Sequence, residues 1–131
     1  MVETSRPSIA AGRRRVLLTA FVLFCASPSR AAPPVAEQRR IDRLIDAVAN
    51  RKDAKFVRNG TAYDGADAAR FLRGKLDSMG SRVGTASDFI EQIASRSSTS
   101  GTLYTIQFAD GRKRPVGEFL KDELRRMDAA Q

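Results

Sequence analysis

The chain has 131 residues, of which 42% are hydrophobic and 29% charged, and this composition fits one globular domain and excludes extensive disorder. It contains no histidine and a single cysteine, Cys25, which excludes the common histidine-based zinc, haem and nucleophile-activating sites. The net charge of +8 falls to +4 after residue 31, because five of the 23 basic and one of the 15 acidic residues lie before that point, and so small an excess argues against nucleic-acid binding.

The first 31 residues have the pattern of a secretory signal peptide. The triplet Arg13–Arg15 precedes an apolar run of eleven residues, Val16–Ala26. That run is shorter than the roughly 20 residues that a membrane-spanning helix needs, but it suits the core of an export signal. Small residues follow, and they place the cleavage site after Ala31. We therefore predict a periplasmic protein without a stable membrane anchor.

Two other kinds of export signal fit the same segment less well. Cys25 would suit lipid attachment, but Phe24 precedes it where a lipoprotein signal has a small residue. The arginine triplet would suit a twin-arginine signal, but the flanking residues Gly12 and Val16 differ from those in stronger twin-arginine signals. We expect the general secretion route. Since Cys25 leaves with the signal, we expect no disulfide in the mature domain.

The first half of the predicted domain contains a helix, a hairpin and a second helix. Residues 32–36 include two prolines and predict an extended leader. A helical apolar period then runs over residues 37–50. Two short strands follow within residues 55–63, joined at Asn59-Gly60, a pair typical of a type I′ turn. Asp64 is expected to cap a helix over residues 66–79, which Gly80 ends.

The second half repeats the alternation of helix and hairpin. Thr85 and Asp88 have the spacing of a capping box, which predicts a helix to about Ser95. Alternating residues 103–108 predict a half-buried strand, and residues 112–114 pair back to it before Pro115 ends the pairing. A last helix is predicted over residues 116–127. The fold class is therefore a small α+β domain over residues 37–128, in the order helix, hairpin, helix, helix, hairpin, helix, with short antiparallel strands that can join into one sheet.

The polar loop of residues 96–101 is the stretch in which we look for a binding site. The hydroxyls of Ser97, Ser98 and Ser100, successive backbone N–H groups and the side chain of Arg96 can surround an anion or a sugar. The same hydroxyls can instead satisfy a helix end and a strand start. Arg58, beside the first turn, is a second candidate for pairing with a ligand carboxylate.

Two functional hypotheses follow from these residues. The first is a non-catalytic binding or accessory domain, whose partner is an envelope protein or an anionic polymer. The second is a serine-lysine hydrolase in which Lys75 activates Ser98 or Ser100, and it requires the amine within about 3 Å of a serine hydroxyl. No calcium-loop pattern or other metal motif occurs, so we predict no metal and no cofactor.

The order of several short motifs resembles the YfeK-like family of small periplasmic proteins (DUF5329), a domain of unknown function. The resemblance covers about residues 37–126 and is carried by the segments 56–60, 72–75, 85–90, 94–101 and Tyr104. It implies export and supplies no established activity, cofactor or catalytic residue. Members of that family often have a histidine where this chain has Phe71, and a cysteine near the first hairpin that is absent here. The candidates for a shared surface are Arg58, Lys75, Ser97, Ser98 and Ser100.

Overall fold

The computed structural model describes residues 33–131, so the predicted signal peptide of residues 1–31 lies outside the described residues. The elements are α1 (Val35–Ala49), β1 (Ala54–Arg58), β2 (Thr61–Tyr63), α2 (Gly65–Met79), the 3₁₀ turn η1 (Gly80–Arg82), α3 (Ala86–Phe89), the π-helix η2 (Ile90–Ala94), β3 (Thr105–Phe108), β4 (Lys113–Pro115) and α4 (Val116–Ala129). The predicted α+β class and the predicted order of elements are confirmed.

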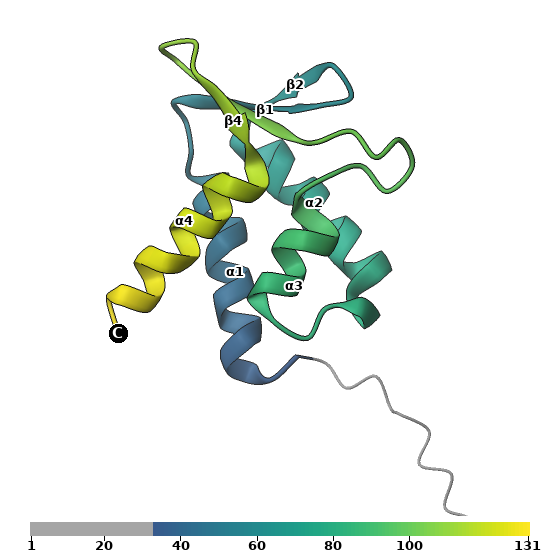
Figure 1. Cartoon of the computed structure of the whole chain (residues 1–131), viewed down its shortest axis with the longest axis vertical. Helices are drawn as coiled ribbons and strands as arrows, with labels where there is room; N and C mark the ends of the chain where they lie inside the picture. Colours follow the sequence, from purple (N-terminus) through teal and green to yellow (C-terminus); the bar gives the residue numbers. More distant parts are fainter. Residues whose placement is uncertain (1–32) are drawn as a thin grey trace, which may run out of the picture.

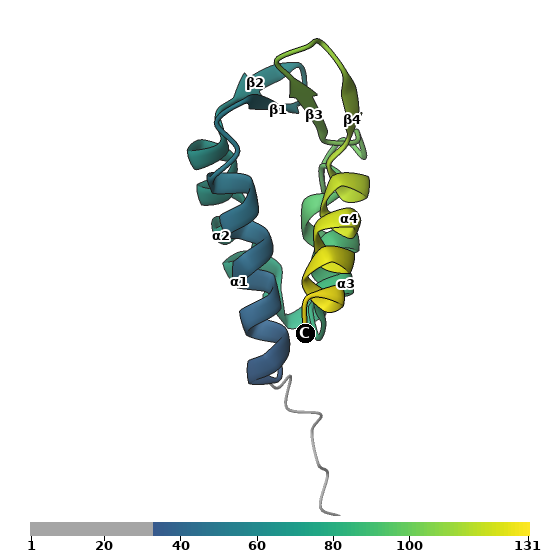
Figure 2. The same cartoon turned by 90° about the vertical axis from the view of Figure 1, so that its left-hand side faces the viewer.

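The helices form two pairs that stand side by side beneath one sheet. In Figure 1 the strands lie at one end of the molecule, and α1 begins and α4 ends towards the opposite end. Figure 2 shows α1 and α2 as one pair and α3 and α4 as the other, with the strands spanning both pairs. None of the helices within residues 33–131 is long and apolar enough to cross a bilayer.

The two predicted hairpins join into a single antiparallel sheet of order β2-β1-β3-β4. The central pair β1 and β3 sets Phe56 opposite Ile106, and both side chains are buried. Asn59 and Gly60 have φ angles of 49° and 80°, as a type I′ turn requires, which confirms the first predicted turn. The sheet thus carries Arg58, the last residue of β1, to the edge of the helical layer.

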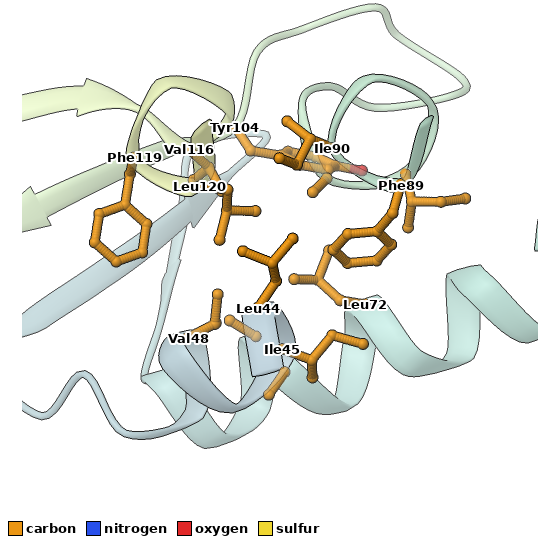
Figure 3. Packing of buried hydrophobic residues seen from close by; sticks show 14 of the residues in the cluster. Leu44, Ile45, Val48, Leu72, Phe89, Ile90, Tyr104, Val116, Phe119 and Leu120 are labelled. Atoms are coloured by element: carbon orange, nitrogen blue, oxygen red, sulfur yellow. The ribbon is translucent and has the colours of Figure 1, made fainter. Parts of the chain in front are cut away.

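The core lies between the two helix pairs. Figure 3 shows Leu44 and Ile45 of α1 and Leu72 of α2 facing Phe89 and Ile90 of the second pair. The largest side chains with under 2% exposure are Phe89, Ile41, Leu44, Ile45, Ile90, Ile93, Ile106, Leu120 and Val48. Burial of this apolar surface is the main term that holds the sheet and both helix pairs together.

Four local predictions need correction. Helix α1 begins at Val35, so residues 35 and 36 are helical and not part of an extended leader. Gly80 follows α2 but has φ of −61°, because the chain continues into a 3₁₀ turn and needs no left-handed residue there. Thr85 caps α3 as predicted, since its hydroxyl accepts from Asp88 N at 3.0 Å, but the Asp88 carboxylate accepts from Gly84 N, one residue earlier than a capping box requires. The third helix changes to π geometry at Ile90.

A charged network joins the beginning of α1 to the other helix pair. The Glu37 carboxylate accepts hydrogen bonds from Ala86 N, at the start of α3, and from Arg40, both at 2.7 Å. Arg40 also donates to Asp128 of α4 at 2.6 Å. The backbone bond from Ala86 and then the bond from Arg40 lower the pKa of Glu37. The ionised carboxylate is therefore the form that ties these three helices together.

We expect Glu37→Gln to destabilise the protein by about 1 kcal/mol at pH 7, since it weakens two charge-assisted hydrogen bonds. A lowered carboxyl pKa contributes stability that is present above the ordinary value of 4.5 and is lost as the pH falls through the folded value. Urea unfolding of both proteins should therefore show a difference at pH 7 that shrinks as the pH falls below 4.5. Glu118→Gln is the control, because Glu118 forms only an exposed i, i+3 pair with Lys121. A difference that persists unchanged at pH 3 would contradict this assignment.

Candidate functional site

Arg58 lies over aromatic rings and has no acidic partner among the described residues. Its guanidinium carbon is 4.0 Å from the ring centre of Phe71 in α2 and 5.4 Å from that of Tyr63 in β2. Its Nη2 donates to the Tyr63 hydroxyl at 3.4 Å, and within residues 33–131 it forms no ion pair. The rings hold the guanidinium in place, and most of its five N–H donors remain available to a ligand.

Lys75 of α2 reaches across to the end of the π-helix. Its amine donates to Arg96 O at 2.7 Å, to Ile93 O at 2.8 Å and to the Tyr104 hydroxyl at 3.2 Å. The two carbonyls need a donor because a helix end leaves its last carbonyls without intrahelical partners. Burial, and then the charge of Arg58, lower the pKa of Lys75. Lys75 therefore holds the start of the serine loop (residues 96–101) in place.

The serine loop is folded back on itself and tied to its neighbours. Ser97 is 6% exposed, and its hydroxyl lies 3.1 Å from that of Thr99. Ser98 is exposed and donates to Met79 Sδ at 3.4 Å, and the Ser100 hydroxyl donates to Asn59 Oδ1 at 3.0 Å. Gly101 closes the loop with φ of 71°. The bond between Ser100 and Asn59 fixes the loop beside the turn that follows Arg58.

These residues surround an open hollow of about 580 Å³, which we call the basic hollow. It is lined by Arg58, Asn59, Phe71, Gly74, Lys75, Ser78, Ser97, Ser98, Thr99 and Tyr104. Four of the six candidates from the sequence therefore meet here. Ser100 does not line the hollow, but its hydroxyl donates to Asn59, which does. Arg96 offers its carbonyl to Lys75, and its exposed side chain is not part of the lining.

A second cavity of about 340 Å³ opens beside the basic hollow, and we call it the apolar pocket. Its lining includes buried Leu72, Ala94 and Val116, and it shares Arg58, Phe71 and Tyr104 with the basic hollow. The sequence analysis did not predict this pocket or the role of the aromatic residues around it. Each of them fits an ordinary core or strand position, and no local pattern shows that they leave space between them.

The geometry around Lys75 does not provide an activated serine. All three amine hydrogens have partners, and none of these is a serine hydroxyl. The Ser98 and Ser100 hydroxyls donate to Met79 and Asn59. Burial raises the pKa of Tyr104, so its hydroxyl stays neutral at pH 7 and accepts from the ammonium. Residues 33–131 also contain no cluster of three or more acidic, cysteine or histidine side chains that could hold a metal.

Comparison with known proteins agrees with the resemblance noted in the sequence. A family model described as a family of unknown function (DUF5329) matches residues 35–128. The uncharacterized protein YfeK of Salmonella typhimurium is 35% identical over 91 residues, which cover 70% of this chain and 76% of that protein. No solved structure matches significantly. The matched region includes the basic hollow, the apolar pocket and the core beneath them.

Proposed function

The chain belongs to the family of unknown function DUF5329, and from the site itself we propose that it is a non-catalytic binding domain for an anionic ligand. The basic hollow is the binding site, and Arg58 is its main contact. In keeping with the predicted signal peptide, we place this activity in the periplasm, where the ligand belongs to the bacterial envelope.

The observation that supports this proposal is a pair of cations without a carboxylate partner. Arg58 and Lys75 line the same hollow, and within residues 33–131 neither forms an ion pair. Their mutual repulsion contributes to the lowered pKa of Lys75. An anion placed between them would remove that repulsion and would accept from the free N–H groups of Arg58.

The serine loop adds neutral donors to the same site. The Ser98 hydroxyl donates to the thioether of Met79, which is a weak acceptor. It can therefore rotate to donate to an anion with little loss of free energy. Ser97 is closed inside the loop and supports it from beneath. Lys75 keeps its three acceptors and acts on the ligand through its charge. In these roles Ser98 donates a hydrogen bond, Ser97 supports the loop and Lys75 supplies charge. None of them acts as a nucleophile, so we favour binding over hydrolysis.

Chemical-shift mapping of the ¹⁵N-labelled protein tests the proposal. The probes are glycan, lipid and protein fractions of an envelope extract. We expect one fraction to shift Arg58, Lys75 and residues 96–101, and Arg58→Gln to weaken that response about tenfold or more. Arg43→Gln makes the same charge change on an exposed residue of α1 that lines neither cavity, and it should bind normally. If none of the three fractions changed the chemical shifts of residues in the basic hollow, the proposal would be wrong.

A further inference from the structure

We propose that the ligand is an aliphatic carboxylate, with its carboxylate on Arg58 and its hydrocarbon chain in the apolar pocket. This inference rests on the proposed anion site and adds the chemical class of the ligand. It follows from the way in which the basic hollow and the apolar pocket meet.

The two cavities have a common wall that contains one charged group and two aromatic rings. Arg58, Phe71 and Tyr104 line both. The guanidinium carbon of Arg58 lies 4.0 Å from the ring centre of Phe71, and the Phe71 and Tyr104 rings meet edge to face with their centres 5.9 Å apart. A group bonded to Arg58 is therefore beside the mouth of the apolar pocket, and an attached chain can enter it directly.

The interior of the apolar pocket suits hydrocarbon better than a polar group. Beyond Arg58, its walls are made largely of Phe56, Val57, Ala68, Leu72, Ala94 and Val116. The acidic side chain in the lining, Asp67, is exposed and pairs with Arg70 at 3.2 Å, so it does not neutralise Arg58. A polar ligand group placed among these apolar side chains would lose its hydrogen bonds to water without finding partners there, whereas methylene groups gain free energy on burial.

The size of the pocket limits the length of the chain. Its volume of about 340 Å³ lies at the lower end of the range for ligand sites. A methylene group needs about as much room as a water molecule, ~30 Å³, so the pocket holds a chain of roughly ten carbons. A single planar carboxylate matches the free edge of one guanidinium, which favours a fatty-acid-like ligand over a large polyanion.

Calorimetric titration of the unaltered protein with acetate, hexanoate, octanoate, decanoate and tetradecanoate, each below its micelle concentration, tests the inference. Affinity should rise about threefold to fourfold for each added methylene and stop rising near ten carbons. Decanol, which has the same chain without the charge, should bind at least tenfold more weakly than decanoate. Arg58→Gln should reduce the affinity for decanoate to that for decanol, while Arg43→Gln should leave it unchanged.

The outcomes separate this inference from the proposed function. If envelope fractions shift the basic hollow but affinity does not depend on chain length, the anion site stands and the aliphatic ligand is wrong. Equal affinity for decanol and decanoate, or decanoate shifts away from Arg58 and Phe71, would also overturn the inference. Ala68→Leu places a larger side chain in the pocket and should weaken decanoate binding without affecting acetate; equal loss of both would show that the chain does not enter there.

Discussion

Gly65→Ala is expected to destabilise the protein by about 3 kcal/mol, which lowers the midpoint of thermal unfolding by roughly 10–20 °C for a domain of this size. Gly65 begins α2 where that helix crosses the end of α1. A Cβ atom at this position would lie 2.4 Å from Val48 O and 3.1 Å from both Ala49 O and Arg51 O. These are backbone atoms that no rotamer change can move. The two helices would have to separate, and the core between them would open.

Gly74→Ala is the matched control for that experiment, because Gly74 lies in the same helix with nothing within 4 Å of the added Cβ. There the substitution should stabilise the protein by about 0.5–1 kcal/mol, as alanine does in an exposed helix. Thermal and urea unfolding of the two variants should thus move in opposite directions from the wild type. Equal stability of Gly65→Ala and the wild type would show that α1 and α2 are not packed this closely.

Much of the fold could be predicted because its signals are local. Asn59-Gly60 specifies its turn through two positive φ angles, and Asp64 accepts from Asp67 N at 2.8 Å as the sequence predicted. The apolar period of α1 placed Leu44 and Val48 in the core, where both are fully buried. Each of these features depends on residues within four positions of one another, so neighbouring residues are sufficient to predict it.

The parts that could not be predicted depend on contacts between distant segments. Nothing near Gly65 indicates that three carbonyls of the preceding helix end lie against it. In the sequence, Phe71 is notable only as a difference from many members of the family, yet its ring lies against Arg58 and lines both cavities. The resemblance to the family grouped Arg58, Lys75, Ser97 and Ser98 as candidates for a shared surface, but the sequence does not show the hollow that the sheet and α2 form around them.

Lys75→Met should cost about 2–3 kcal/mol of stability and should also loosen the serine loop. Methionine keeps the length of the side chain but donates nothing, so Ile93 O, Arg96 O and the Tyr104 hydroxyl lose their donor. Each buried acceptor without a partner costs about 1–3 kcal/mol. Water can replace the donor at exposed Arg96, and removing a partly buried charge returns some free energy, so the total stays below the sum of three such losses.

Hydrogen exchange distinguishes this structural role of Lys75 from a purely electrostatic one. The amides of Ser97 and Gly101 bond to Thr102 O and Ser97 O within the loop, and both should exchange faster in Lys75→Met. Lys113→Met removes the same charge from an exposed residue of β4, and its effect on stability should stay within about 0.5 kcal/mol. If Lys75→Met matched that control in both stability and exchange, the lysine would not hold the loop, and its contribution to the basic hollow would be its charge alone.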